Sequence, residues 1–458
     1  MQAREARPTR PGKGRRGRKG SRGRKEESVF AVFAFFAVFA VFAFFAVFAF
    51  LSVLASAQAG PALSAPDRVI VGMMLRQVED DLRKHYYDPT FHGIDLTARV
   101  REAEQRLKTT TGFNDAVATI SDVLTELDDS HTTFLPPKRS VRVDYGWQMA
   151  MVGDAPLVVS VTPESDAAAK GLAPGDRVLL LNALEPTRGN LWRLAYLYRF
   201  IRPQALQRVA ILEPDGSART LDIRSRVDNH AVTQLRDLLI ELGDIVYRAR
   251  DVSEAVGRDI LVWRMAVFRD ADHVDAMIGK ARNYKTLVLD LRGNGGGALD
   301  ALRALVSRCF DREVHIATVQ QREKRERRIA KPARTGFRGR LIVLVDSRSA
   351  SAAEMFARIV QIEERGGVIG DRTAGAVMTS RIMSHKVGVT GVVYATSVTI
   401  GDVIMSDGAS LEKVGVVPDE IVLPSPADLA ASRDPVLARA IALAGGSMTP
   451  DQAGRLFK

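Results

Sequence analysis

Residues 287–297 read LVLDLRGNGGG, a short apolar run that leads directly into a cluster of glycines. A continuous apolar run of this length is typical of a strand that is buried on both faces. A second run, LIVLV at 341–345, leads into the loop DSRSASAAE and then into a helical stretch that begins near Ala352. Such strand–loop–helix units predict an α/β core from about residue 229 onward.

The glycine-rich loop at 292–297 is the first candidate functional element. Glycines allow the backbone to approach a ligand closely and to point amides at a negative charge. The loop lacks the GxxxxGK[ST] pattern and does not fit GxGxxG, so a nucleotide site is not indicated. The alternative is a tight turn without a ligand.

The serine-rich loop at 346–354 is the second candidate. A serine just ahead of a helix is most often an N-cap. It can also be a nucleophile, because the free amides and the positive dipole end of the helix stabilise an oxyanion. The GxSxG elbow of α/β-hydrolases is absent.

The third candidate is Ser130-His131, in a polar loop directly after a helical stretch. Its hydroxyl and carboxylate neighbours are suited to orienting an imidazole that acts as a base. A capping or solvated histidine is the alternative interpretation.

The segments before the α/β core differ in their pattern of apolar residues. Helical spacing of apolar residues over 67–127 predicts a small helical layer, and short β-branched runs over 145–226 predict a β-rich segment. Within that segment, GLAPGDRVLLLN at 171–182 resembles the GL-x-x-GD motif of PDZ domains. The resemblance implies capture of an extended peptide at a sheet edge, with a nest for the terminal carboxylate at Gly146, Trp147, Gln148 and Met149. A β-rich insert without a ligand is the alternative.

Charge is concentrated at the N-terminus of this 458-residue chain, whose net charge is +11. Residues 1–27 carry +8, which leaves only +3 for the remainder. An apolar FAVFAFF-type run follows at 29–55, so the basic block is expected to orient a membrane segment rather than to bind nucleic acid. Small-x-small sites at 55–57 and 57–59 leave open whether this segment is a signal anchor or a cleaved signal peptide. The single cysteine, Cys309, excludes an intrachain disulfide.

Taken together, the loops resemble the S41 serine peptidases, a family that includes tail-specific and tricorn core proteases. The matching segments occur in the family's order and span residues 67 to about 425. They are LDDSHT (127–132), GLAPGDRVLLLN (171–182), LVLDLRGNGGG (287–297), VLVDSRSASAAE (343–354), VIGDRTAGA (368–376) and LEKVGVVPD (411–419).

The resemblance implies that Ser351 is the nucleophile. Tail-specific proteases use a lysine as the base, but Ala376 stands at that position and no lysine lies between Arg372 and Met383. The tricorn-like subgroup instead uses a histidine with a preceding serine and a glutamate. The resemblance therefore implies His131 as the base, and Ser130 and Glu412 as the residues that support it. The implied oxyanion hole consists of the backbone amides of Ala352 and of Gly296 or Gly297.

We therefore expect an α/β multidomain protein with a crotonase/ClpP-like core, an N-terminal helical layer, an inserted PDZ-like domain and an N-terminal signal anchor. The expected function is serine endopeptidase activity on extended polypeptides in the cell envelope, facing the periplasm or exterior, without a metal or organic cofactor. Two alternatives are a catalytically silent relative that binds a peptide or lipophile, and a PDZ-based membrane scaffold. The sequence sets no oligomeric state. The expected boundaries are 1–28 for the basic flank, 29–57 for the membrane segment, 67–140 for the helical domain, 141–228 for the PDZ-like domain, 229–425 for the catalytic core and 426–458 for a helical tail.

Overall fold

The computed structural model describes residues 63–137, 142–228, 251–388 and 391–457. The chain divides into two compact units, Met1–Pro61 and Ala62–Lys458, and every described residue belongs to the second. The predicted basic flank and the predicted membrane segment lie outside the described residues. Among the residues that are described, no helix is both long enough and apolar enough to cross a membrane.

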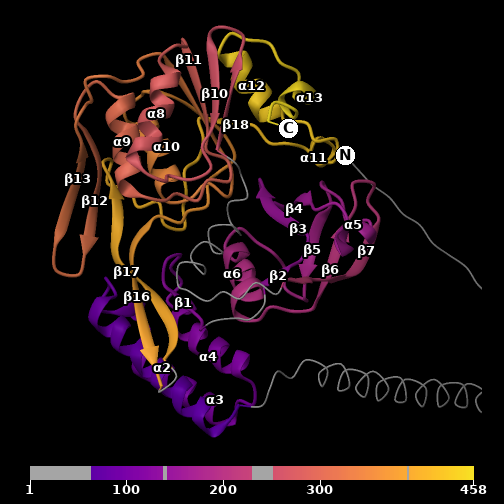
Figure 1. Ribbon diagram of the computed structural model, residues 1–458, viewed down its shortest axis with the longest axis vertical. Coiled ribbons are helices and arrows are strands. Elements are labelled where there is room, and N and C mark those ends of the chain that lie inside the picture. The colour runs from indigo at the N-terminus through magenta and orange to yellow at the C-terminus, as the bar shows by residue number, and fades with distance from the viewer. Residues whose placement is uncertain (1–62, 138–141, 229–250, 389–390, 458) are drawn as a thin grey trace, which may run out of the picture. The chain divides into compact units, whose positions relative to one another are not determined.

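The centre of the second unit is a six-stranded sheet in the order β18-β15-β14-β11-β10-β9 (Figure 1). All neighbours pair in parallel except β9, which is antiparallel to β10. The two apolar runs of the sequence form adjacent parallel strands, β11 and β14. The loops that follow these strands therefore lie at the same edge of the sheet, where the strands' carboxyl ends meet. The bounds are β9 Val252–Val256, β10 Ile260–Arg264, β11 Thr286–Asp290, β14 Arg340–Val345, β15 Gly366–Gly370 and β18 Glu420–Ile421.

Helices cover both faces of this sheet. Alternate strand residues such as Leu289 and Val343 pack with α8, α9 and α10, while Val288 and Leu344 pack with α12 on the other face. Both faces are apolar because side chains alternate along each strand, which explains the continuous apolar runs. The helix bounds are α8 Ala271–Ala281, α9 Leu299–Cys309, α10 Ala352–Ile362, α11 Pro426–Ala430, α12 Pro435–Leu443 and α13 Pro450–Ala453.

A second, five-stranded sheet joins the core to the N-terminal helices. Its order is β1-β17-β12-β13, and β16 also pairs with β17. The helices α2 to α4 share one apolar core with this sheet, in which the ring of Phe134 lies 5.7 Å from that of Tyr394. The bounds are α2 Ala65–His85, α3 Leu96–Thr109, α4 Phe113–Thr125, β1 Thr133–Leu135, β12 Val314–Gln321, β13 Arg325–Ala330, β16 Met378–Val387 and β17 Val392–Met405.

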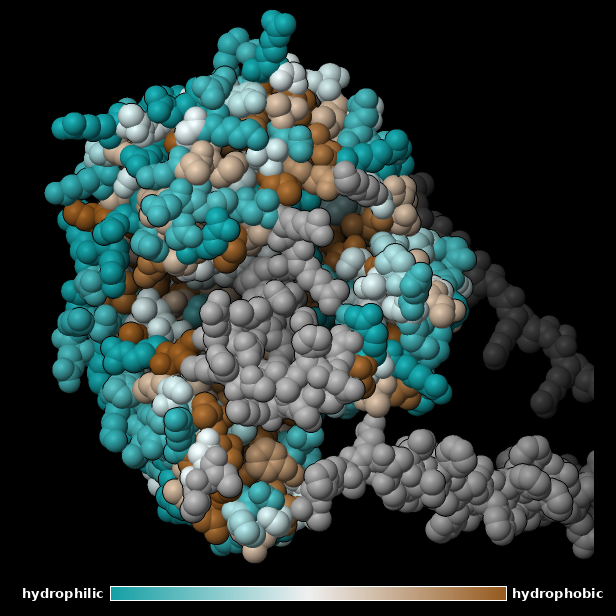
Figure 2. All heavy atoms as spheres, viewed as in Figure 1, coloured by the Kyte–Doolittle hydropathy of each residue, from teal (hydrophilic) through white to brown (hydrophobic). Residues whose placement is uncertain are grey.

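The side of the core formed by β12 and β13 is predominantly hydrophilic (Figure 2). Arg325 and Arg327 of the edge strand β13 are exposed. Charged side chains on an edge strand discourage pairing with another chain.

The β-rich segment has an apolar core of its own, which includes Trp147, Val158 and Ile223. Five antiparallel strands follow the order β3-β4-β5-β6-β7, and β2 pairs with β8 where the chain enters and leaves the segment. The bounds are β2 Arg142–Asp144, β3 Trp147–Val152, β4 Ala155–Val161, α5 Asp166–Ala169, β5 Arg177–Leu181, α6 Leu191–Tyr196, β6 Leu206–Leu212, β7 Ala218–Arg224 and β8 Arg226–Asp228.

The predicted mixed α/β class is confirmed by this arrangement and by its likeness to known folds, reported below. The crotonase/ClpP-like description of the core, the PDZ-like identity of the β-rich segment and the signal anchor remain predictions.

Candidate active site

Ser130 and His131 lie in the short loop between α4 and β1. The Oγ atom of Ser130 lies 2.7 Å from Nδ1 of His131 and donates to Oε2 of Glu412 at 2.9 Å. An ionised carboxylate only accepts hydrogen bonds, so the lone pair of the Ser130 hydroxyl is left to accept from Nδ1–H. This chain of contacts assigns the proton to Nδ1 and leaves Nε2 of His131 unprotonated, as a general base requires.

Glu412 is held by three donors. Its carboxylate accepts from the backbone amide and hydroxyl of Ser130 and from the amide of Val377, each at 2.9 Å. Burial raises the pKa of Glu412 above its ordinary value, and the hydrogen bonds from Ser130 and Val377 oppose that effect. Glu412 therefore bridges the histidine loop and the segment 375–377, although they are far apart in sequence.

The electrostatics around His131 combine two opposing effects. Burial lowers the pKa of the imidazole, while the negative charge of Asp129 raises it. The residue nevertheless retains some exposed surface. A base that is neutral near pH 7 and still reachable by a reacting group fits this environment.

Ser351 is the residue before α10 and has an unusual backbone conformation, with φ of 54° and ψ of −119°. Residues other than glycine rarely adopt a positive φ, and such backbone strain persists only where the surrounding structure imposes it. The amide of Ser351 donates to the carbonyl of Ala376 at 3.0 Å and to Oε2 of Glu354 at 3.1 Å. The amide of the preceding Ala350 donates to the carbonyl of Asn294 at 2.9 Å. These contacts fix the turn that carries Ser351.

Glu354 is fully buried and accepts further hydrogen bonds from the Thr373 hydroxyl and from the amides of Gly375 and Ala376. Burial raises the pKa of its carboxyl to about 7 despite these four donors. The capping-box pattern Ser-x-x-Glu accounts for its contact with the amide of Ser351. Glu354 thus ties the start of α10 to segment 373–376.

Segment 375–377 connects the two halves of the site. Glu354 accepts the amide of Ala376, Glu412 accepts the amide of Val377, and Ser351 donates to the carbonyl between them. No hydrogen bond joins Ser351 to His131 within the part of the chain that the structure describes. The arrangement therefore brings Ser351, Glu412, Ser130 and His131 into one connected neighbourhood without a formed nucleophile–base contact.

The glycine loop lies against the start of α10. A Cβ atom on Gly296 would lie 2.6 Å from Cβ of Ser351 and 2.9 Å from the nitrogen of Ala352, so only glycine fits there. The amide of Gly296 donates to Oδ1 of Asn294 at 2.8 Å and is therefore occupied. Of the predicted oxyanion donors, this leaves the amide of Gly297 and the amide of Ala352, which is the first residue of α10.

Ion pairs hold Arg292, the first residue of the glycine-rich loop, in place. Arg292 contacts the fully buried Asp290 and pairs with both carboxylate oxygens of Asp434, each at 2.8 Å. Burial opposes ionisation of Asp290, but the guanidinium groups of Arg292 and Arg264 outweigh it and hold the pKa of that carboxyl well below its usual range. Asp434 also caps α12, so the glycine loop is connected to the C-terminal helices.

The predicted peptide-binding residues show mixed environments. Trp147 is buried in the core of the β-rich segment, and the Gly146 amide already donates to Oδ1 of Asp144 at 2.9 Å. Met149 packs partly buried against the same core as Trp147. Trp147 and the half-buried Gln148 both line a cavity of about 650 Å³ between the β-rich segment and the α/β core.

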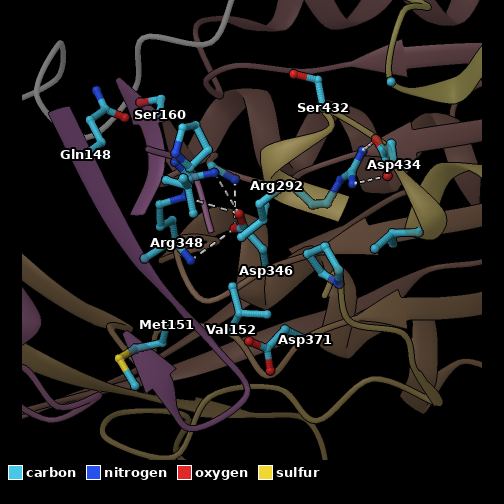
Figure 3. Close-up of a pocket in the computed structure, with 18 of the residues that line it drawn as sticks. Gln148, Met151, Val152, Ser160, Arg292, Asp346, Arg348, Asp371, Ser432 and Asp434 are labelled. Atoms are coloured by element: carbon cyan, nitrogen blue, oxygen red, sulfur yellow. Dashed lines mark hydrogen bonds and ion pairs between the residues drawn. The ribbon is translucent and has the colours of Figure 1, made fainter. Parts of the chain in front are cut away.

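That cavity is polar at its centre (Figure 3). Arg348 pairs with Asp346 beside Arg292 and Asp434, and β3 contributes residues from the opposite side. The lining includes none of Ser351, His131 and Glu412. Among the described residues, no group of three His, Cys, Asp or Glu side chains is placed to bind a metal ion.

Residues 259–422 match the family model described as Peptidase family S41. The chain carries an S41 peptidase domain. This result confirms the family predicted from the sequence motifs and, with it, the serine-type peptidase class. The S41 domain contains Ser351, Glu412 and the glycines 296 and 297, whereas Ser130 and His131 lie before it.

Two curated relatives have protease names. The tail-specific protease of Haemophilus influenzae is 29% identical over 312 residues, covering 63% of this chain and 43% of that protein. The carboxyl-terminal-processing protease of a Picosynechococcus species is 24% identical over 364 residues, covering 74% of this chain and 80% of that protein. The chain therefore spans less than half of the first relative and most of the second.

The fold also resembles that of a solved structure. The crystal structure of mature CPAF aligns with a TM-score of 0.60 at 15% identity, covering 79% of this chain and 94% of that chain. At this identity the likeness shows a shared fold.

Sequence reasoning missed the residues that act through the backbone. The amides and the carbonyl at 375–377 are backbone groups, so no side-chain motif marks them in the sequence. The contacts of Asn294 are not marked by a motif either. The role of Glu354 has a signal in the sequence, the capping-box spacing Ser-x-x-Glu at 351–354.

Proposed function

We propose that the protein is a serine endopeptidase that hydrolyses peptide bonds in extended polypeptides, with Ser351 as nucleophile and His131 as general base. The observation that carries this proposal is the chain of contacts from Nδ1 of His131 through Ser130 to Glu412. Glu412 also accepts the amide of Val377, and the carbonyl of the preceding residue, Ala376, accepts the amide of Ser351. Family membership supplies the reaction class.

The proposed reaction begins when Nε2 of His131 takes the hydroxyl proton of Ser351 and Oγ attacks the scissile carbonyl carbon. The negative charge that forms on the carbonyl oxygen is met by the amides of Gly297 and Ala352, and losing one such donor typically costs about 10²- to 10³-fold in rate. The imidazolium then gives its proton to the leaving amine. A water molecule, activated by the same histidine, hydrolyses the acyl-enzyme and regenerates Ser351.

The nucleophile–base contact is expected to form when substrate is bound, because catalytic hydrogen bonds are often long or absent in a free enzyme. A lysine base is disfavoured. Ala376 occupies the position of the lysine in tail-specific proteases, and Lys413, the neighbour of Glu412, pairs with Asp128.

The β-rich segment at 141–228 is proposed to be a PDZ-like module that receives substrate. Its strand β3 is at the end of the sheet order, where an extended peptide can be added through backbone hydrogen bonds. Gln148 is half-buried and lines the cavity, which makes it a candidate for contact with the peptide. The apolar segment at 29–55 is proposed to place the enzyme in the cell envelope.

Hydrolysis of dye-quenched casein by the full-length chain, purified in mild detergent, tests the proposal. Ser351→Ala, His131→Ala and Glu412→Gln are compared with Ser217→Ala, a control in the β6–β7 turn. We expect loss of hydrolysis in Ser351→Ala and His131→Ala, and wild-type rates in the control. A fluorophosphonate probe should label the wild type and fail to label Ser351→Ala.

Hydrolysis that survives in Ser351→Ala would exclude this serine as the nucleophile. A silent binding protein predicts no hydrolysis and no probe labelling in the wild type. A PDZ-based scaffold predicts full biological function after Ser351→Ala.

A further inference from the structure

Asp129, which directly precedes the Ser130-His131 pair, is a buried carboxylate outside the proposed four-residue constellation. Only 2% of the residue is exposed. Its Oδ1 atom accepts from the amide of His131 at 2.9 Å, the amide of Thr132 at 2.7 Å and the hydroxyl of Thr399 at 2.7 Å. Three donors on one oxygen fix the carboxylate firmly against the backbone of the histidine.

The other oxygen of Asp129, Oδ2, is buried and has no hydrogen-bond partner in the described structure. The phenol oxygen of Tyr86 is likewise buried and makes no hydrogen bond of ordinary length. Burial, followed by the charge of Asp129 and a side-chain interaction with that carboxylate, raises the pKa of this phenol far above its ordinary value, so the phenol and the carboxylate of Asp129 are neighbours. No lysine or arginine forms an ion pair with Asp129 among the described residues. A buried carboxylate without a cation is costly, which makes a purely structural role a poor explanation.

The charge of Asp129 faces the histidine loop. Among the described residues, it is the only group that raises the pKa of His131 against the effect of burial. The other ionisable groups around the loop include Glu412, reached through Ser130, and the phenols of Tyr86 and Tyr87, which follow α2. His92 contacts the carbonyl of Leu127 and the phenol of Tyr87, and from β17 Asp402 acts on Tyr87. The cations near the loop, Arg193 and Lys413, both pair with Asp128 and not with Asp129.

The backbone of His131 is held from both sides. Its amide donates to Asp129, and its carbonyl accepts from the Ser397 hydroxyl of β17 at 2.7 Å. The ring contact with Ser130 is separate from both of these contacts. Asp129 and Ser397 therefore fix the backbone position from which the imidazole extends. Ser130 and Glu412 fix the orientation of the ring.

We propose that Asp129 is a positioning residue for His131 and that its buried negative charge stabilises the imidazolium formed during peptide hydrolysis. This inference rests on the proposed function, in which His131 is the base. Asp129 acts through the histidine and does not contact substrate. It gives the base a second carboxylate that has no bond to the ring.

Asp129→Asn is the test, because asparagine keeps an acceptor oxygen for the three donors and removes the charge. The full-length chain is assayed on dye-quenched casein, and kcat/KM is followed from pH 5 to 9. Removing a nearby negative charge lowers the pKa of the imidazole, so the acidic limb should move to lower pH by about one unit. The plateau should fall about tenfold through kcat, with KM little changed.

Ser397→Ala is the matched control, since it removes a hydrogen bond from the His131 carbonyl without changing any charge. We expect it to leave the position of the acidic limb unchanged. A wild-type acidic limb in Asp129→Asn overturns the inference, whereas activity in Ser351→Ala or His131→Ala overturns the proposed function instead.

If Asp129→Asn does not fold, as judged by its thermal transition, Tyr86→Phe replaces it. Loss of the phenol leaves the carboxylate charge less neutralised, so the acidic limb should move to higher pH. No movement in that variant also overturns the inference.

Discussion

Replacing Ser130 with alanine would break the link between His131 and Glu412 while leaving both side chains in place. The lost hydroxyl bridges Nδ1 of His131 at 2.7 Å and Oε2 of Glu412 at 2.9 Å. A hydrogen bond to a charged group is worth about 1.5–3 kcal/mol. Because each 1.36 kcal/mol is a tenfold change in rate, kcat should fall about 10- to 150-fold. KM should change little, since Ser130 is not proposed to contact substrate.

A double-mutant cycle with Glu412→Gln makes this prediction specific. If Glu412 acts through Ser130, removing the hydroxyl first leaves the second change with less effect. The double mutant should therefore lose at least about 1 kcal/mol less than the sum of the single losses. Thermal transitions are measured alongside, because Glu412 also accepts the amides of Ser130 and Val377. Strict additivity, or wild-type kcat in Ser130→Ala, would refute the proposed relay.

Two further predictions concern the nucleophile turn. Gly296→Ala places a Cβ 2.6 Å from the Cβ of Ser351, at a residue with φ of 95°, and should lower kcat more than tenfold. Gly216→Ala is the control, because Gly216 has a similar φ of 91° but open space around it, and it should not lower kcat in this way. Equal casein hydrolysis by the two variants would contradict the close packing of the glycine loop. Glu354 has a pKa of about 7 in the folded protein against 4.5 ordinarily, so the native state binds the extra proton and its stability falls as pH rises through this window. The wild-type advantage over Glu354→Gln in urea unfolding should therefore shrink by about 2.5 kcal/mol from pH 5 to pH 8, and an unchanged difference would rule out this titration.

The fold was largely predictable because its core depends on strong local signals. The apolar runs at 287–291 and 341–345 became β11 and β14, since a parallel sheet covered on both faces requires such runs. The start of α12 also depends on a local signal, because Asp434 precedes Pro435 and accepts the amide of Leu437. Strand order was not predictable, because the pairing of β11 with β14 joins segments separated by some fifty residues and depends on tertiary packing.

Within the candidate site, only the residues that act through their side chains were predictable from the sequence. Ser130, His131, Ser351 and Glu412 are reactive residue types in recognisable motifs, so the family resemblance could point to each one. The occupied amide of Gly296 could not be foreseen, because glycine presents the same backbone group whether it binds Asn294 or a substrate. Asp129 was visible within the DDSHT motif, but its missing cation appears only when its surroundings are known.

The backbone contacts at 375–377 explain how this chain can lack the lysine of tail-specific proteases. The buried carboxylate of Glu354 and the half-buried carboxylate of Glu412 bind consecutive amides of this segment, and the amide of Ser351 donates to the carbonyl between those amides. Every one of these contacts uses main-chain atoms of residue 376 or its neighbour, so the side chain at position 376 is not needed to hold the nucleophile. Alanine at this position is then compatible with an active site, provided that a base reaches Ser351 from elsewhere. The loop that carries His131 is connected to the same segment through Glu412, and it is from this direction that the base is expected to approach.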